Sequence, residues 1–401
     1  MDIKTLKVER GLPSLTPEMR QNFLAAGLVY MMLFTPVNMV SQTTAVSAVL
    51  ILALILRGSF FRFLRSRLKT LVAIIIFLTV NAALSPLPKE ASTGAFNVFK
   101  GLWILPVAIL ASDSLTKSRF RWVAMLLSVT ASVISIALLT QVVEWQRTYH
   151  SLTTWSESHI GNIHNLNNFL FISLLLAGIT AWRYHDRVSR ILILLAALPI
   201  VLMCILVKSE GSILALGCTV LLLTGLHHRN RLSLALAGLP VLTLQVAYVF
   251  PEQFSSLTGI QAHTLHVRSQ IYSKLFDAWT QHPFMGWGAG TYKYVEAVAV
   301  EGTQYLYPHN LYLEALFSVG IIGILIIGAW LIKALSHIDF GAVIEDPARA
   351  FALATLTYLC VKGMSDMNLM SYHTVGLLSI CFGILLGPKE NLKTKQQTSG
   401  A

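Results

Sequence analysis

Long apolar runs recur along the whole chain, and this recurrence limits the fold more than any other feature of the sequence. A helix that crosses a bilayer needs roughly 20 mostly apolar residues, and stretches of this kind follow one another from residue 22 to residue 387. Only 12% of the residues are charged, whereas soluble domains carry about 25%. The sequence therefore predicts an all-α integral membrane protein.

Hydropathy divides the chain into a short leader, a membrane region and a polar tail. We predict about 12 transmembrane helices, on apolar runs at 22–40, 43–57, 70–86, 95–112, 122–142, 165–182, 191–207, 212–226, 232–250, 311–332, 350–364 and 373–387. Residues 1–21 form the leader, 22–388 a single polytopic domain, and 389–401 the tail.

The positive charges indicate which side of the membrane each loop faces. With twelve spans, one side receives both termini, together with 22 of the 30 Lys and Arg and 9 of the 19 acids. That side nets +13 and the other −2. Because positive residues collect in cytoplasmic loops, we expect both termini in the cytoplasm. The overall charge of +11 then reflects topology and does not suggest a nucleic-acid partner.

One loop is much longer than the rest, and we expect it to be functional. Residues 251–310 fall on the extracytoplasmic side of this topology, as a large periplasmic loop containing short helices. Its middle, Arg268 to Gln281, reads as an amphipathic helix that could lie along the membrane surface. The apolar face of this helix comprises Leu265, Ile271, Tyr272, Leu275, Phe276 and Trp279.

Polar residues gather on the same outer side. They include Lys100 in the fourth helix, Arg147, His150, His159 and His164 in the loop at 143–164, Lys208 and Glu210 in a short turn, Arg268, His309 and Asn310 in or after the long loop, and Lys362 and Asp366 at the end of the eleventh helix. Ionisable residues within membrane helices usually face an interior site. We favour such a role for Lys100. For Lys362, snorkelling to the interface remains an equal alternative.

The histidines suggest proton transfer more than metal binding. His150, His159 and His164 match no metal-ligand spacing, so we read them as loop residues and predict no metal site. His309 follows Pro308 and precedes Asn310, a good N-cap for the next apolar helix. A histidine in this position suits anion binding or proton transfer, or it merely caps the helix.

Several cations converging on one face favour an anionic ligand such as a diphosphate, because Arg offers paired hydrogen bonds and Lys a point charge. The chain has neither a Walker loop nor the Rossmann glycine pattern. A nucleotide cofactor is therefore not expected, and no other cofactor is predicted.

Four stretches within about 205–325 resemble the superfamily of O-antigen ligases and Wzy-type polymerases. They are Arg268-Ser-Gln-Ile-Tyr272, His282-Pro-Phe-Met-Gly-Trp-Gly-Ala-Gly290, Pro308-His-Asn-Leu-Tyr-Leu-Glu314 and Gly320-Ile-Ile-Gly323. Elsewhere the resemblance rests on topology, with about twelve helices, cytoplasmic ends and one large late loop.

This resemblance implies a membrane glycosyltransferase of the GT-C type in the bacterial inner membrane, with its active site in the periplasm. Such enzymes take a glycan from undecaprenyl diphosphate without nucleotide or metal. Ligases pass it to lipid A-core, and polymerases to a second lipid-linked glycan. The family's histidine falls on His309, its loop arginine on Arg268 and its fourth-helix lysine on Lys100.

Two sets of site residues follow from the motifs and the resemblance. We expect His309 or Glu210 to act as the catalytic base. Residues expected to bind the diphosphate or other parts of the substrate are Arg268, Lys100, Lys208, Arg147, Asn310, Tyr272, His164 and Asp366.

The chain departs from the family at one position. Ligases commonly carry Ser-Arg-Gly where this chain has Ser209-Glu210-Gly211. Either Lys208 or Arg147 compensates for the missing cation, or Glu210 serves as the base, or the substrate or activity has changed.

The alternative from another class is a small-anion transporter. It is disfavoured because the sequence suggests neither half-to-half symmetry nor broken helices. Between the two enzymes we favour the ligase, because the loop at 143–164 is short.

Overall fold

The computed structural model of the chain describes residues 16–34, 51, 59–144, 163–184, 186–207, 209–258, 262–300, 303 and 305–387. Throughout these ranges the regular structure is helical, and β-pairing is limited to an isolated bridge between Val300 and Thr303. The predicted all-α class is confirmed.

The helices follow the apolar runs closely. They are α1 (Pro17–Phe34), α3 (Ser59–Ala83), α4 (Pro88–Leu102), α5 (Ile104–Ala111), α6 (Lys117–Glu144), α8 (Ile163–Arg183), α9 (Arg187–Val207), α10 (Glu210–His228), α11 (Arg231–Leu236), α12 (Leu239–Val249), α13 (Pro251–Thr258), α14 (Ala262–Trp279), α15 (Leu311–Ser336), α16 (Phe340–Glu345), α17 (Pro347–Lys362) and α18 (Tyr372–Leu386), with 3-10 turns η1 (Ser112–Ser114), η2 (Tyr292–Tyr294) and η3 (Glu296–Val298). Eleven of the twelve predicted runs overlap with described helices. Residues 35–40 of the first run, and all of 43–57 apart from position 51, lie outside the described residues.

Two of the predicted spans are each divided into a pair of helices. The run at 95–112 is split at Trp103, and the run at 232–250 at Ala237–Gly238. Pro106 and Pro240 follow these points, and proline supplies no amide hydrogen to the turn before it. The divisions therefore have a local cause in the sequence.

Seven helical stretches in the described part of the chain are long and apolar enough to cross a membrane. They are Pro88–Ser114, Lys117–Thr140, His164–Arg183, Arg187–Val207, Glu210–His228, Arg231–Tyr248 and Leu311–Ser336, and two shorter apolar helices span Lys69–Ala83 and Tyr372–Leu386. The total of about twelve spans stays a prediction.

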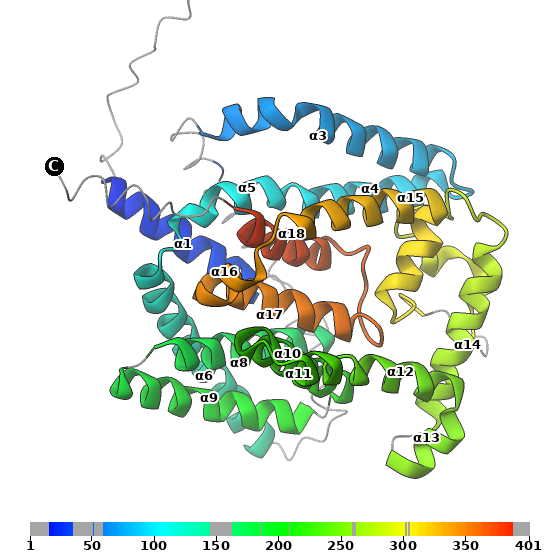
Figure 1. Cartoon of the computed structure of the whole chain (residues 1–401). Helices are drawn as coiled ribbons and strands as arrows, with labels where there is room; N and C mark the ends of the chain where they lie inside the picture. Colours follow the sequence, from blue (N-terminus) through cyan, green and yellow to red (C-terminus); the bar gives the residue numbers. More distant parts are fainter. Residues whose placement is uncertain are drawn as a thin grey trace, which may run out of the picture.

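Helix α17 forms the centre of the bundle, between α8, α10 and α18 (Figure 1). Ala350, Ala352 and Ala354 are fully buried along it, and such small residues let neighbouring helices approach closely. Outer helices such as α9 instead expose leucines, among them Leu194, Leu195 and Leu198. A surface of this kind suits lipid as the surrounding solvent.

The long segment 251–310 folds into short helices that lie at one end of the bundle, on the right of Figure 1. Helix α14 begins at Ala262, six residues before the predicted start. Ile271 and Leu275 are buried in a small core beneath it, whereas Phe276 is half exposed. The helix packs on α12, α13 and α15, so a protein surface accounts for most of its apolar face.

Helix α15 is broken at Gly320, and this corrects the expectation that no helix is interrupted. Gly320 has φ 61° and ψ −169°, a conformation that residues with a Cβ rarely adopt. The loop at 283–288 replaces the missing helical bonds. Ile321 and Ile322 donate to the carbonyls of Pro283 (2.9 Å) and Phe284 (3.1 Å).

The carbonyls released on the other side of the break are satisfied by the same loop. Phe317 accepts from the Trp287 amide at 2.8 Å, and Ser318 accepts from Gly288 at 3.0 Å. Asn81 of α3 adds a side-chain bond to the carbonyl of Met285 at 2.6 Å. The loop therefore stabilises the break, because it provides hydrogen-bond partners for two amides and two carbonyls that the helix leaves unpaired.

Replacing Gly320 with Ala should destabilise the protein. An added Cβ would lie 2.3 Å from the Phe284 carbonyl oxygen, and the backbone conformation of Gly320 alone costs a residue with a Cβ about 1–3 kcal/mol. Gly328 lies in the same helix with open space around it, so Gly328→Ala is the matched control. Thermal unfolding of the purified proteins should show a lower Tm for Gly320→Ala only. Equal Tm values for the two variants would show that the break is not required.

Candidate functional site

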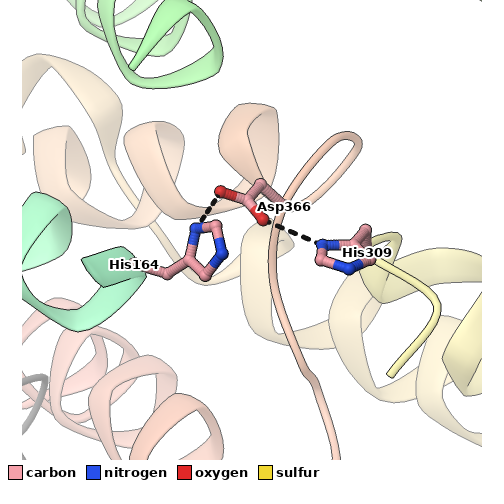
Figure 2. A group of neighbouring side chains, drawn as sticks. All are labelled: His164, His309 and Asp366. Atoms are coloured by element: carbon pink, nitrogen blue, oxygen red, sulfur yellow. Dashed lines mark hydrogen bonds and ion pairs between the residues drawn. The ribbon is translucent and has the colours of Figure 1, made fainter. Parts of the chain in front are cut away.

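A buried carboxylate joins three segments at the end of the bundle where α13 and α14 lie. Asp366 follows α17, His309 precedes α15, and His164 lies in the first turn of α8. One carboxylate oxygen of Asp366 is 3.0 Å from His309 Nδ1, and the other contacts His164 Nδ1 (Figure 2). The structure thus brings together three of the predicted site residues, and it places His164 in a helix rather than in a loop.

Backbone bonds hold the turn before α15 against the end of α17. Leu311 donates its amide to the Gly363 carbonyl at 2.7 Å. The Asn310 side chain donates to the Met364 carbonyl at 3.1 Å, and the Tyr272 hydroxyl donates to the same carbonyl at 3.3 Å. His309 itself has φ 56°, an uncommon conformation for a non-glycine residue that is typical of functional sites.

The amides at the start of α15 are occupied. The Asn310 side-chain oxygen accepts from Tyr312 and Leu313, at 3.0 and 3.1 Å. Together with the Leu311 bond, this leaves the first turn of the helix little capacity to bind an anion. The predicted N-cap, Asn310, is confirmed, so His309 does not itself cap the helix. Of the other two roles considered for His309, the geometry favours proton transfer.

Electrostatics around Asp366 favour its ionised form. Burial would raise the pKa of this carboxyl, but the charge and hydrogen bond of His164, the hydrogen bond of His309 and the charge of Lys362 hold the pKa well below its ordinary value. An ionised carboxylate only accepts hydrogen bonds, so the Nδ1 atom of His309 must carry the proton that it donates.

The His309 imidazole is kept neutral by its surroundings. Burial lowers the pKa of His309 below its ordinary value, and the cation of Arg268 acts in the same direction, while Asp366 opposes them. With Nδ1 donating to Asp366, the neutral ring presents a lone pair at Nε2. His309 therefore has the form of a general base oriented by a carboxylate.

Arg268 and aromatic rings complete the surroundings of His309. Arg268 lies on α14, within the electrostatic range of Asp366 and His309 and close to Tyr248 and Tyr272. The ring of Tyr307 packs against the imidazole with 4.4 Å between ring centres, and Tyr305 lies 6.3 Å away. Arg268 and Tyr272 are therefore placed beside the histidine with which they were grouped from sequence.

Lys362 is buried beside this cluster and does not snorkel to an interface. Its side chain is completely inaccessible, and its ammonium donates to the Asn168 side-chain oxygen at 2.8 Å. Tyr358 donates to the Ser212 hydroxyl at 3.1 Å, and Ser209 donates to Ser212 at 2.7 Å. A buried polar chain therefore runs from the turn before α10 toward the ammonium group.

The remaining predicted residues either make no hydrogen bond or ion pair with the cluster in the described part of the chain, or lie outside the described residues. Lys100 is exposed on α4, with its ammonium over the rings of Phe96 (5.0 Å) and Tyr372 (5.3 Å). Glu210 is exposed in the first turn of α10, and its side chain has no partner among the described residues. Lys208 and Arg147, like His150 and His159, lie outside the described residues.

Glu314 has a structural role that we did not predict. It is 2% exposed in the first turn of α15. Its carboxylate accepts from the backbone amides of Leu369 and Met370, in the segment that follows Asp366. The sequence did contain a signal for this role, because Glu314 is an acidic residue within an apolar helix and belongs to the Pro308–Glu314 stretch.

The cluster also meets the distance requirement of a metal site. Ligand atoms of His164, His309 and Asp366 lie within 4.8 Å of one another. Both histidines, however, direct Nδ1 at the Asp366 carboxylate. Hydrogen bonding therefore accounts for this arrangement, and three ligands with this geometry do not by themselves require an ion.

The apolar helices, together with the family match, define a multi-pass membrane protein. Residues 191–328 match the family model described as O-antigen ligase, which confirms the resemblance to that superfamily. The match contains Arg268, His309 and Glu314, whereas His164, Lys362 and Asp366 lie outside it. No curated protein matches the chain significantly.

Removing the Glu314 carboxylate should loosen the Asp366 segment. In Glu314→Leu, two buried amides lose their acceptor, and each unsatisfied group costs about 1–3 kcal/mol. Glu314→Gln keeps one acceptor oxygen of the same shape and serves as the matched control. Thermal unfolding of the purified protein should give the lowest Tm for the Leu variant. A Leu variant as stable as the Gln variant would contradict the role.

Proposed function

We propose that this chain transfers a glycan from undecaprenyl diphosphate to a sugar hydroxyl, at the site formed by His309 and Asp366. The observation that carries the proposal is the buried His309–Asp366 pair, whose histidine and neighbouring Arg268 both fall in the segment that matches the O-antigen ligase family. The family match supports glycosyl transfer as the general activity. The His309–Asp366 pair provides a base that can activate the acceptor hydroxyl.

His309 acts as the base in this proposal. Its Nε2 atom accepts the proton of the acceptor hydroxyl while the hydroxyl oxygen attacks the anomeric carbon of the donor. The bond from that carbon to the diphosphate oxygen breaks, and the electron pair leaves with the lipid diphosphate. Asp366 stabilises the imidazolium that forms, as the carboxylate of a catalytic triad does. The proton then passes to the leaving diphosphate or to water.

Arg268 binds the diphosphate and stabilises the charge that develops on it. A guanidinium gives paired bonds to phosphate oxygens, and Arg268 lies within electrostatic range of both His309 and Asp366. The exposed Lys100 and the unplaced Lys208 and Arg147 are secondary candidates. Glu210 is not assigned as base, because nothing in the described structure connects its side chain with His309.

We propose ligation to lipid A-core as the reaction, with polymerisation onto a second lipid-linked glycan as the alternative. The proposal assigns the site to the periplasmic face of the bacterial inner membrane, because the charge pattern predicts both termini in the cytoplasm and the segment 251–310 on the other side. Membrane lipid surrounds the bundle. The broken helix α15 does not favour transport, since loop backbone occupies the break.

The proposal predicts that purified protein in lipid nanodiscs joins the glycan of an undecaprenyl-diphosphate donor to lipid A-core and releases the lipid diphosphate. His309→Ala should reduce the rate by at least about a hundredfold, since general base catalysis contributes 10²–10⁴-fold. His337→Ala, at the exposed far end of α15, is the control and should keep full activity. The readout is the glycolipid product, resolved on gels and by mass spectrometry.

Three results would revise the proposal. Full activity in His309→Ala would contradict the role of base. Extension of the donor itself, without capping of lipid A-core, would assign polymerase activity. Loss of activity in EDTA, with recovery on adding a divalent metal, would show that the cluster of His164, His309 and Asp366 binds a metal ion.

A further inference from the structure

Lys362 is a buried cation that the proposed reaction does not use. Its side chain has no accessible surface, although it is the last residue of α17. An ammonium group in such a place is costly unless it is paired and hydrogen-bonded. Buried ionisable residues in membrane proteins are usually functional for this reason.

The partners of the ammonium connect it with the cluster. It donates to Asn168 at 2.8 Å and approaches the backbone carbonyl of His164 at 3.5 Å. His164 in turn contacts the Asp366 carboxylate. Asp366 follows Lys362 by one helical turn, with its amide bonded to the Lys362 carbonyl at 3.0 Å. Side chains four residues apart in such a turn are neighbours.

The geometry argues against Lys362 as a direct ligand of the donor. Asn168, which holds the ammonium, is itself buried, and the ring of Tyr358 lies 5.9 Å from the same group. A diphosphate would have to displace these contacts. The charge of Lys362 instead acts on Asp366 electrostatically, through an interior where charges are weakly screened.

Resting on the proposed function, we propose that Lys362 is a positioning residue whose buried ammonium balances the charge of Asp366 and so keeps His309 and His164 aligned on that carboxylate. Asn168 holds the ammonium in place by accepting its hydrogen bond. The hydrogen bonds that link Tyr358, Ser212 and Ser209 connect the end of α17 with the start of α10. Without this cation, the charge of Asp366 is balanced, among the described residues, only by the two histidines and by Arg268. The base would then lose its neutral, oriented form.

The test compares three variants in the nanodisc transfer assay. Lys362→Met removes the charge and the donor, Lys362→Gln keeps a donor for Asn168 but no charge, and Lys362→Arg keeps the charge. Lys333→Met, on the exposed last turn of α15, is the control. For each protein, kcat, the KM for the donor and the Tm are measured.

The expected result is a kcat lowered about tenfold in the Met and Gln variants, as when coupled residues of one network are separated. The donor KM should stay unchanged, and Arg should restore much of kcat. The Tm of the Met and Gln variants should fall, because removing one partner of a buried charge pair leaves the other charge uncompensated. The kcat values are therefore compared at a temperature well below the Tm of every variant, where the tenfold loss should persist in folded protein.

Four results would overturn the inference. These are full kcat in Lys362→Gln, a raised donor KM with unchanged kcat, no recovery in Lys362→Arg, and a loss of kcat fully explained by unfolding. The rate of the wild-type protein tests the proposed function separately. If the wild-type protein transfers no glycan, the proposed function is wrong. If it is active, the variants test the role of Lys362.

Discussion

The structure depends most on one buried carboxylate and the groups that keep it charged. Asp366 is 8% exposed, and an isolated ion at such depth would be protonated rather than tolerated. His164, His309, Lys362 and Arg268 supply hydrogen bonds and positive charge from four different helices or turns. Because these partners come from distant parts of the chain, the carboxylate also fixes how the ends of α8, α15 and α17 meet.

A second constraint acts through the backbone. The break at Gly320 turns the first part of α15 into a short helix anchored by the loop at 283–288. Glu314 and Asn310 then join that short helix to the segment around Asp366. The two members of the proposed base pair therefore sit on elements that are bonded to each other on several sides, as precise catalytic geometry requires.

Hydropathy predicted most of the helices because each apolar run must become a helix in lipid. It could not predict which residues meet. His164 and Asp366 are far apart in the sequence and become neighbours only through packing. Lys362 was ambiguous because an apolar run does not reveal whether a lysine near its end faces protein or the interface. Gly320 carried a signal in the Gly320-Ile-Ile-Gly323 stretch, but glycine is common in membrane helices. The orientation in the membrane is predicted from the charge pattern, because positive residues collect in cytoplasmic loops.

The central claim is that His309 and Asp366 act as one catalytic unit, and a double-mutant cycle tests it most directly. The rate of glycan transfer is measured for His309→Ala, Asp366→Asn and the double variant, in protein confirmed to be folded. If Asp366 works through His309, the double variant should be no slower than His309→Ala alone, because residues that act as a unit are strongly non-additive. Losses that multiply in the double variant would show that the two residues act independently and would contradict the account.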